Sequence, residues 1–465
     1  YALTVPSCQD SIHLLPIWEP GVVDSLYGMS SWQLNPEFFS GELHSAFPHL
    51  DTVGKQLRAV VNILHAMGKT VGMDVIPHTD RYSEMSLAQP HFFEWLRRDG
   101  MRIVDHRADL HEEVQQRIYD FVSARGSAVP DESAPSSVEA LFRACDERRR
   151  LRILFGEAND RDGRNRRRSA LVGHLHHDGY EPVPATMAPP YRGLEVDPRD
   201  DARTIDSNGL EWRDYAITEP QAMSRVFGPL ARYKLYERLD DNANWAIDFA
   251  RPRNEVWSYV CDKYYRAQRA FGFDFMRGDM SHVQMRPEGV PAVIGEHYDI
   301  LRAVKRHIVG QGVGHFAYFA ESFLAPPNVM AYGDEVDHLE ACEADSTLGD
   351  LQSTEVGSEE FISLFRHYSE ILHTRQVSPA FTVITGDKDD PRFDLFYRAG
   401  NALRLFCGLF LGDMPSYMAL GFETRDPHPT PAPNEHYTKL FVFHEVKGPK
   451  ATRGPYIWGK NAALF

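Results

Sequence analysis

The sequence lacks a hydrophobic run long enough to cross a membrane. The apolar run at residues 403–411 is interrupted by Arg404 and Gly408, and it falls well short of the roughly 20 residues that a membrane-spanning helix needs. Positive charge is also scarce, because 50 Lys and Arg residues stand against 66 Asp and Glu residues and give a net charge of −16. We therefore expect neither a membrane protein nor a nucleic-acid-binding protein.

Cysteine is rare and shows no paired spacing. The five cysteines contain no C-x-x-C pair, and an odd number cannot all pair with one another, so the composition is typical of a reducing compartment. We therefore predict a cytoplasmic protein. The chain starts at Tyr1 without a basic-then-apolar leader, so we expect either that a leader was removed or that the chain is part of a longer polypeptide.

Phosphate-binding motifs are also lacking. We find no G-x-x-x-x-G-K-[ST] and no G-x-G-x-x-G after a predicted strand, which argues against nucleotide chemistry. What the sequence does contain is a globular composition, with 43% hydrophobic and 25% charged residues. A chain of 465 residues with this composition has room for two or three domains.

An amphipathic helix followed by a short apolar strand recurs along the chain. This alternation implies right-handed crossovers and a parallel sheet. The number of units favours the α/β class, as a TIM-type (β/α)8 barrel. The predicted helices cover residues 50–67, 254–270, 301–309, 359–373 and 395–411, and the predicted strands cover residues 70–76, 273–276, 315–320, 381–385 and 414–420.

One connection is much longer than a crossover helix requires. About 195 residues separate the third predicted barrel strand from the next one. A large domain inserted after this third strand is the simplest explanation. We therefore expect a first barrel part at residues 1–85, an inserted domain at residues 86–250 and a second barrel part at residues 251–465.

Two charged stretches of the insert could bind ligands but have simpler explanations. Residues 143–168 contain 10 Arg and 5 acidic residues, a pattern more typical of a solvated helix and loop than of an anion site. The side chains of His174, His176, His177 and Asp178 are more typical of a polar loop than of a metal site, because no second pair of ligands with suitable spacing follows.

Acidic residues follow three of the predicted strands. Asp279 comes after one strand together with Arg277, and Glu321 and Asp389 come after two others. The carboxyl ends of parallel barrel strands meet on one face, so we expect these carboxyls to lie close together. Retaining glycosidases use two carboxyls about 5–5.5 Å apart, one as nucleophile and the other as acid/base.

At these residues the sequence resembles the α-amylase clan of glycoside hydrolases and glucanotransferases. The resemblance extends from about residue 12 to about residue 425, and the insert falls where that family keeps its extra domain. Four motifs in the expected order make the resemblance specific. The similar segments are residues 272–279 (GFDFMRGD), 319–321 (FAE), 387–392 (DKDDPR) and 72–77 (GMDVIP), with a weaker match at residues 14–18 and Tyr27-Gly28.

The resemblance implies a retaining, α-glucan-active enzyme that cleaves α-1,4 links. Asp279 would be the nucleophile, kept ionised by Arg277. Glu321 would be the acid/base, which needs a raised pKa, and Asp389 would stabilise the transition state through sugar hydroxyls. The residues expected to bind substrate are Arg277, His282, Lys388, Tyr27, Asp74, His78 and Arg392.

Glu296 is a competing candidate for the acid/base. It follows Asp279 by 17 residues, which leaves little room for a helix and another parallel strand. Glu321 follows Asp279 by 42 residues and leaves enough room. We therefore prefer Glu321.

The sequence departs from the family pattern at two places. His78-Thr79 stands where the third-strand motif ends in Asn-His, and Lys388 stands where a His is usual. The Asn is a usual calcium ligand, so we expect no cofactor and doubt the calcium site. Lys388 is a permanent cation, so we expect altered recognition of the first donor sugar.

These departures leave the reaction open. They are more typical of unusual specificities or transferases than of a standard starch hydrolase. The sequence therefore supports two alternatives about equally. One is an amylase-like hydrolase, and the other is a transglycosylase, namely a glucano- or maltosyltransferase. An inactive carbohydrate-binding barrel is the less favoured alternative. We expect an α-glucan or maltooligosaccharide as partner, and the sequence does not indicate an oligomeric state.

A first barrel strand is not evident. The motifs supply strands two to eight, and nothing before residue 12 looks like a strand and a helix. Either the chain is an interior part of a longer polypeptide, or a strand at residues 440–446 takes the vacant place beside the strand at residues 12–17.

Overall fold

The centre of the fold is a parallel sheet. The computed structural model describes residues 9–21, 26–187, 193–205, 209–219, 225–239, 246–281, 286, 289–322, 335–348, 354–383, 401–410, 413–418, 422–425, 437–440, 445–447 and 450–452. All neighbouring strands of the sheet are parallel. Their order is β1 (Ser11–Leu14), β4 (Thr70–Val75), β17 (Phe275–Gly278), β18 (Ala317–Ala320), β19 (Ser346–Thr347) and β20 (Ser378–Pro379).

The series of parallel strands continues beyond β20. After Ala380 the chain enters β21 (Phe381–Val383), which pairs in parallel with β22 (Ser416–Met418). Gln9, just before β1, donates a hydrogen bond from Nε2 to Oγ of Ser416, 3.1 Å away. The last strand of the series therefore lies beside the first. Counted with β20 and β21 as one position, the described strands supply seven positions of the predicted (β/α)8 barrel.

Helices precede or connect these strands, and the predicted alternation is confirmed with shifts of a few residues at the ends. The strand β19 and the helix before it were not predicted, because both are short. The helices are α2 (Val53–Ala66), α7 (Asn254–Phe271), α8 (Ile300–Gly310), α10 (Glu335–Ala341), α11 (Glu359–Thr374) and α13 (Asn401–Phe410).

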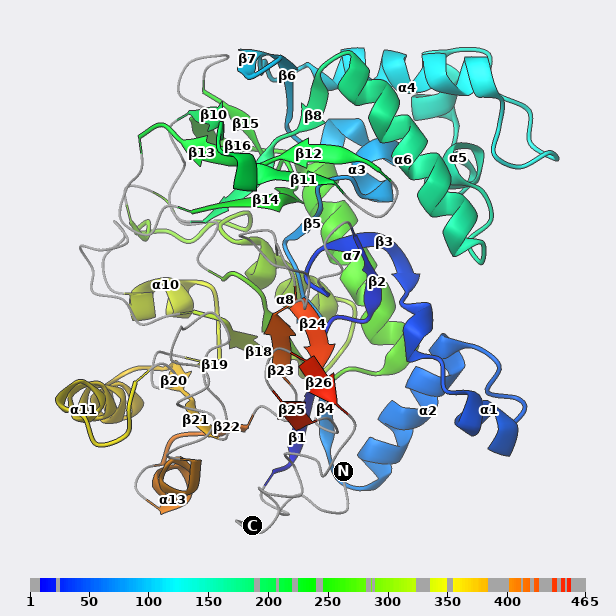
Figure 1. Cartoon of the computed structure of the whole chain (residues 1–465). Helices are drawn as coiled ribbons and strands as arrows, with labels where there is room; N and C mark the ends of the chain where they lie inside the picture. Colours follow the sequence, from blue (N-terminus) through cyan, green and yellow to red (C-terminus); the bar gives the residue numbers. More distant parts are fainter. Residues whose placement is uncertain are drawn as a thin grey trace.

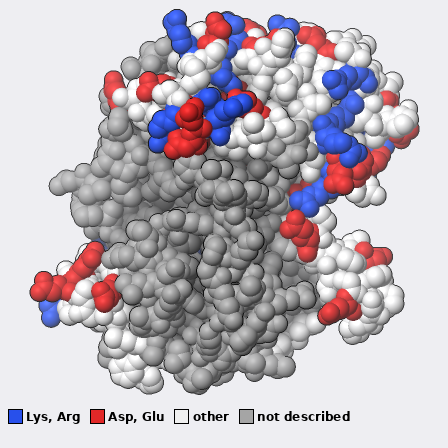
Figure 2. All heavy atoms as spheres, viewed as in Figure 1, with Lys and Arg blue, Asp and Glu red and all other residues white. Residues whose placement is uncertain are grey.

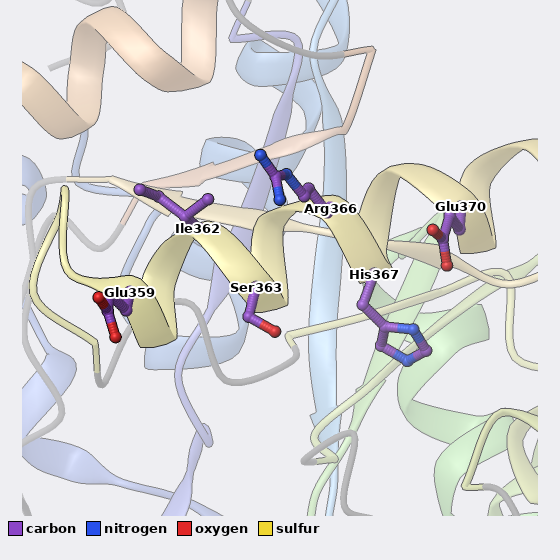
Figure 3. Close-up of a pocket in the computed structure, with 6 residues that line it drawn as sticks. All are labelled: Glu359, Ile362, Ser363, Arg366, His367 and Glu370. Carbon is purple, nitrogen blue, oxygen red and sulfur yellow. The ribbon is translucent and has the colours of Figure 1, made fainter.

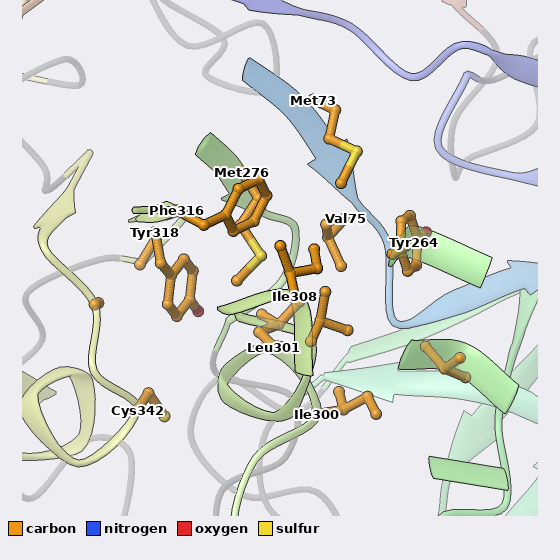
Figure 4. Packing of buried hydrophobic residues seen from close by; sticks show 14 of the residues in the cluster. Met73, Val75, Tyr264, Met276, Ile300, Leu301, Ile308, Phe316, Tyr318 and Cys342 are labelled. Atoms are coloured by element: carbon orange, nitrogen blue, oxygen red, sulfur yellow. The ribbon is translucent and has the colours of Figure 1, made fainter. Parts of the chain in front are cut away.

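The sheet and its helices share one hydrophobic core. Leu301, Val304 and Ile308 lie on one stripe of α8 and are buried, which is the spacing of an amphipathic helix. Leu301 and Ile308 pack toward Met276 of β17 and its neighbours on β4 and β18 (Figure 4), and all three α8 residues belong to the same cluster. This packing fixes the strand ends that carry the site.

The segment between β4 and β17 has a second core of its own, formed by residues from Tyr82 to Trp212. Figure 1 shows most of its elements grouped above the parallel sheet. The exact domain boundaries stay a prediction. The elements are β5 (His78–Asp80), α3 (Glu84–Ala88), β6 (Trp95–Asp99), β7 (Arg102–Asp105), α4 (His111–Arg125), α5 (Glu147–Phe155), α6 (Arg161–His177), β8 (Tyr180–Pro182), β9 (Pro184–Met187), β10 (Leu194–Val196), β11 (Arg203–Ile205), β12 (Glu211–Arg213), β13 (Tyr215–Ile217), β14 (Arg225–Arg232), β15 (Tyr236–Arg238) and β16 (Ile247–Pro252).

The arginine-rich stretch is less solvated than predicted. Arg150 and Arg164 are both 3% exposed. Arg150 donates to backbone carbonyls such as that of Leu141, and Arg164 binds the carboxylates of Glu19 and Glu84. A buried guanidinium needs acceptors for its five N–H groups. Arg150 therefore stabilises the insert from within, and Arg164 connects it to the chain before residue 86.

The outer arginines of the same stretch do face solvent. Arg149 and Arg152 form ion pairs with Glu132, and basic and acidic groups are interspersed over this part of the surface in Figure 2. The histidines at 174, 176 and 177 lie in the last turn of α6 rather than in a loop. The prediction of a polar loop was wrong there, because the helix continues to His177.

Elements near the N-terminus and late in the chain complete the fold. The predicted pairing of residues 440–446 with residues 12–17 does not occur among the described residues. Antiparallel pairing with a nearby strand closes a much shorter loop. Residues 1–8 lie outside the described residues. The remaining elements are β2 (Trp18–Pro20), β3 (Met29–Leu34) and α1 (Gly41–Ala46), with β23 (Phe422–Arg425) paired to β24 (Tyr437–Leu440) and β25 (Glu445–Lys447) paired to β26 (Lys450–Thr452).

The described helices include none with both the length and the apolar character needed to cross a membrane.

Candidate active site

The register of two neighbouring strands brings Asp279 and Glu321 together. Gly278, the last residue of β17, lies opposite Ala320, the last residue of β18. The next residue on each strand is therefore one of the two acids. Backbone hydrogen bonds continue past the strand ends, since the amide of Glu321 donates to Gly278 O at 3.0 Å and that of Asp279 donates to Val75 O at 3.0 Å. The two carboxyls thus follow adjacent strands at one level of the sheet.

The turn after β17 requires a glycine. A Cβ atom on Gly278 would lie 2.5 Å from the Tyr318 ring and 2.8 Å from Leu301, so only glycine lets the strand end pack this closely. Met280 then takes a left-handed conformation with φ of 49°, which is strained for a residue with a side chain. Its amide donates to Oε2 of Glu321 at 3.1 Å. The turn therefore holds the glutamate in place.

Arg277 connects three carboxylates. Its Nη1 atom lies 2.9 Å from Oδ1 of Asp74 and 2.9 Å from Oδ1 of Asp279, and its Nη2 atom pairs with Oε1 of Glu321. Asp74 is opposite Arg277 in the register between β4 and β17. A planar guanidinium suits this task because its N–H groups diverge in one plane and can bridge several carboxylates at fixed angles.

The two acids differ in exposure. The Asp279 side chain is 6% exposed, whereas the Glu321 side chain is 28% exposed. Asp279 therefore lies on the protein side of the site and Glu321 on the solvent side. A group that exchanges protons with a leaving group or with water needs this access.

The electrostatics of Asp279 differ from the expectation. Burial raises the pKa of Asp279 well above its usual range, and the negative charge of Glu321 and a hydrogen bond with it raise this pKa further. Arg277 lowers the pKa, as expected, but burial and the charge of Glu321 outweigh it. Without a bound ligand, the two acids therefore behave as a pair that holds a proton between them.

His78, on β5, faces this pair. Its Nε2 atom is 3.6 Å from Oδ2 of Asp279, and the ring also bonds to the backbone of Tyr27. Burial lowers the pKa of His78 to about 4, with a further lowering by Arg277. The imidazole is therefore neutral at ordinary pH, and it can exchange hydrogen bonds with a neutral polar ligand.

Some buried polar atoms of the site lack a partner. Within the described part of the chain, Nε2 of His78 and Oδ2 of Asp74 are buried and have no hydrogen-bond partner of good geometry. Leaving such an atom unpaired costs about 1–3 kcal/mol. A ligand that carries several hydroxyl groups would remove this cost.

Tyr27 was predicted as a substrate-binding residue, and it lies against the site. Its ring centroid is 5.1 Å from the Arg277 guanidinium carbon, a cation–π distance. The structure therefore brings together Tyr27, Asp74, His78, Arg277, Asp279 and Glu321 among the predicted residues.

The other predicted site residues are not placed. His282, Lys388, Asp389 and Arg392 lie outside the described residues, so their roles stay predictions. The rejected candidate Glu296 is exposed in the loop before α8.

Sequence reasoning missed two residues of the site. His13 on β1 has its Nε2 atom 3.2 Å from Oδ1 of Asp74. The sequence did carry a signal for this residue, because a histidine between Ile12 and Leu14 interrupts an otherwise apolar strand. Tyr417 on β22 stacks on Phe319 with ring centroids 5.4 Å apart. Burial raises the pKa of Tyr417 to about 12, and Arg277 lowers it. Nothing in its local sequence pointed to the site.

The residues present do not fit a calcium ion at the place where the resemblance suggests one. Calcium takes hard oxygen ligands, whereas His78 directs an imidazole toward Asp279. The hydroxyl of the following Thr79 donates to the Asp80 carbonyl.

A separate pocket lies along α11 and does not belong to this site (Figure 3). Its lining residues are all exposed and all come from one helix. It therefore lacks the convergence of several elements that marks the acid pair. The lining consists of Glu359, Ile362, Ser363, Arg366, His367 and Glu370.

Comparison with known proteins gives structural matches only. No family model and no curated protein matches the sequence. An α-amylase from Geobacillus thermoleovorans complexed with acarbose matches with 12% identity and a TM-score of 0.38, over 88% of this chain and 59% of that one. An α-amylase from H. orenii matches with 12% identity and a TM-score of 0.42, over 95% of this chain and 65% of that one.

A third match is the cyclic α-maltosyl-(1→6)-maltose hydrolase from Arthrobacter globiformis, with 13% identity and a TM-score of 0.37, over 90% of this chain and 63% of that one. As the motifs led us to expect, these structures are α-amylase-family enzymes. The chain spans about 59–65% of the length of the three matched structures. We therefore base the proposal that follows on the geometry of the site.

Proposed function

We propose that the chain is a retaining, α-glucan-active enzyme that cleaves α-1,4-glucosidic bonds through a covalent glycosyl–Asp279 intermediate. One observation carries the proposal: Asp279 and Glu321 follow adjacent parallel strands in register and are bridged by one buried arginine. A double displacement requires two neighbouring carboxyls, one as nucleophile and the other as acid/base.

The first displacement forms the intermediate. Oδ2 of Asp279 attacks the anomeric carbon while the glycosidic C–O bond breaks, and Glu321 gives its proton to the leaving oxygen. Arg277 stabilises the Asp279 carboxylate before attack and the Glu321 carboxylate after proton transfer, because it contacts both. The proton held by the pair thus ends on the leaving group, and Asp279 is free to act as nucleophile.

The second displacement releases the sugar. Glu321 takes a proton from the incoming hydroxyl, whose oxygen attacks the anomeric carbon as the bond to Asp279 breaks. Both acids return to their starting states. When the incoming hydroxyl belongs to water the enzyme is a hydrolase, and when it belongs to another sugar it is a glucano- or maltosyltransferase. Acceptor affinity and water exclusion decide between them.

The chemistry of the site supports a sugar as ligand. His78 is neutral, and its Nε2 atom and Oδ2 of Asp74 have no protein partner within the described residues. Hydroxyl groups can both donate and accept hydrogen bonds, so a sugar can satisfy these atoms without bringing charge into the buried site. The altered residue at position 388 motivates the transferase alternative and lies outside the described residues.

The covalent intermediate gives a direct test. A Glu321→Gln variant should accumulate it when supplied with α-maltosyl fluoride, because fluoride leaves without protonation while the second displacement lacks its base. Mass spectrometry of the peptides should show one added maltosyl group on the peptide that contains Asp279. The Glu296→Gln variant removes an exposed carboxyl from a nearby loop and should turn over normally.

The outcomes separate the alternatives. A label on a different carboxylate, or a Glu321→Gln variant with normal turnover, contradicts the assignment. A wild-type chain that binds maltooligosaccharides but never cleaves them indicates a carbohydrate-binding barrel. For an active chain, products longer than the substrate show transfer, and net growth of reducing ends shows hydrolysis.

A further inference from the structure

Three potential metal ligands meet behind the turn that carries Asp279. Asp299 precedes α8, His338 lies on α10, and Cys342 follows α10 directly. Ligand atoms of the three side chains all lie within 4.8 Å of one another, and the three residues are buried at 0–1% exposure. None of them takes part in the sugar chemistry proposed above.

The hydrogen bonds of His338 fix the roles of its two nitrogens. Nε2 lies 3.1 Å from the carbonyl oxygen of Ser281. A carbonyl can only accept, so Nε2 carries the proton of the neutral ring and Nδ1 keeps a lone pair. A metal-binding histidine commonly donates its other N–H to a backbone carbonyl in this way, which fixes the ring orientation.

The spacing of nitrogen and sulfur suits a tetrahedral ion. Sγ of Cys342 lies 3.7 Å from Nδ1 and 3.5 Å from Nε2 of His338. A nitrogen and a sulfur bound to the same tetrahedral zinc ion are roughly 3.6 Å apart, so a small rotation of the imidazole ring would let Nδ1 and Sγ share one ion. The Tyr298 hydroxyl lies 2.9 Å from Nδ1 and donates to it in the metal-free chain, so the binding of an ion replaces this hydrogen bond.

Asp299 supplies a second, independent indication. Its Oδ1 atom accepts from the Arg302 amide at 2.8 Å and so caps α8. Its Oδ2 atom is fully buried and has no hydrogen-bond partner of good geometry among the described residues. A buried carboxylate oxygen without a partner is costly unless a cation neutralises it.

We propose that Asp299, His338 and Cys342 bind one zinc ion. Imidazole nitrogen and cysteine sulfur are soft or borderline donors, which favour zinc and disfavour calcium and magnesium. On binding, the Cys342 thiol gives its proton to solvent and the thiolate sulfur bonds to the ion, while Oδ2 of Asp299 gains a partner. The ligands come from two helix ends, so an ion here ties α8 to α10.

The ion would also brace the active-site turn. His338 bonds to Ser281 O, and Oγ of Ser281 in turn donates to Gly278 O at 2.9 Å. Gly278 immediately precedes Asp279. A fixed His338 ring would therefore hold the backbone that positions Asp279. Cys342 belongs to the same buried cluster as Tyr318 (Figure 4).

Metal binding by the whole chain tests the proposal. The chain is stripped with a chelator, dialysed against a slight excess of zinc, and its metal content measured. We expect about one zinc ion per chain, and thermal unfolding at a higher temperature with zinc than without. Calcium should give neither effect. Cobalt(II) in place of zinc should produce a thiolate-to-cobalt charge-transfer band, which requires sulfur in the ligand set.

Three variants locate the site. Cys342→Ser should abolish the charge-transfer band and weaken zinc binding at least about tenfold. Asp299→Asn keeps an oxygen acceptor to cap α8 but removes the charge, and it should weaken zinc binding in the same way. The control is Cys261→Ser, which removes another buried free cysteine and should bind zinc as the wild type does.

Each outcome decides the question. The proposal is overturned if the wild-type chain retains no zinc, if its cobalt complex lacks the charge-transfer band, or if Cys342→Ser binds zinc like the wild type. Circular dichroism of the metal-free variants shows whether they fold. If Cys342→Ser fails to fold, the wild-type cobalt spectrum and the Asp299→Asn titration decide. The measurements do not depend on sugar turnover, so the proposed reaction can fail while the zinc site stands.

Discussion

Replacing Asp279 with Asn should abolish turnover while making the fold more tolerant of rising pH. Burial and Glu321 raise the pKa of Asp279 above its ordinary value of 3.8, so the folded chain binds this proton more tightly than the unfolded chain. The corresponding stability is fully present below about pH 3.8 and is lost as the pH rises through the folded-state pKa. The variant has no such proton to lose.

The size of the effect follows from proton linkage. One proton held by the folded but not the unfolded chain changes the free energy of unfolding by about 1.4 kcal/mol per pH unit. The difference between D279N and wild type should grow in favour of the variant by up to this slope from about pH 4 upward. It should level off above the folded-state pKa. Because Asp279 and Glu321 interact, the slope belongs to the proton that the pair shares.

Urea unfolding at a series of pH values measures the slope for both proteins. Glu296→Gln serves as a control, because that carboxyl is exposed, and its curve should run parallel to the wild type. Under the proposed function, the turnover of maltooligosaccharides by D279N should fall by at least about 10⁴-fold. If the free energies of unfolding of D279N and wild type differ by the same amount at about pH 4 and pH 8, the reasoning about the acid pair is refuted.

Three further predictions concern the surroundings of the acid pair. Replacing Arg277 with Met should lower the free energy of unfolding by about 3–5 kcal/mol at neutral pH, because buried carboxylates lose their shared cation. Urea unfolding should show a smaller loss at acid pH, where the carboxyls are protonated. A loss that does not change with pH would contradict the bridging role. The variant His78→Gln should keep the shape of the wild-type pH profile of turnover between about pH 5 and 8, because the pKa of His78 is about 4. Kinetic assays over this range measure the profile. A shift of its acid limb in the variant would argue against a neutral imidazole. The variant Tyr264→Phe removes a hydroxyl that accepts a hydrogen bond from the amide of Ile76 and donates one to its carbonyl, just beyond β4. Urea unfolding should show a free energy of unfolding lower by about 1–3 kcal/mol. An unchanged free energy of unfolding would show that these bonds are not needed.

The repeating helix and strand pattern could be predicted because local signals fix it. The apolar stripe of α7 and the glycine after it mark the helix and its end, since Gly272 adopts a left-handed conformation with φ of 83°. The meeting of Asp74, Arg277, Asp279 and Glu321 was also predictable, because parallel strands end at one edge of a sheet.

The missed features depend on contacts between distant segments. Tyr417 reaches the site because β22 closes the strand series beside β1, which no local pattern reports. The burial of Arg150 and Arg164 depends on the way α5 and α6 pack. The direction of the Asp279 pKa shift depends first on burial and then on the nearness of Glu321, and both follow from the packing of segments that are distant in the sequence.

The pairing of Arg277 with Asp74 joins positions 203 residues apart, so the two strands that carry them leave the ribosome at different times. A ribosome adds roughly 5–20 residues per second, so β4 emerges some 10–40 seconds before its neighbour β17 exists. During that interval the edge of β4 has no permanent partner on that side. The intervening segment has its own apolar cluster and can fold first, which leaves the half-made sheet as the stage most in need of chaperone protection.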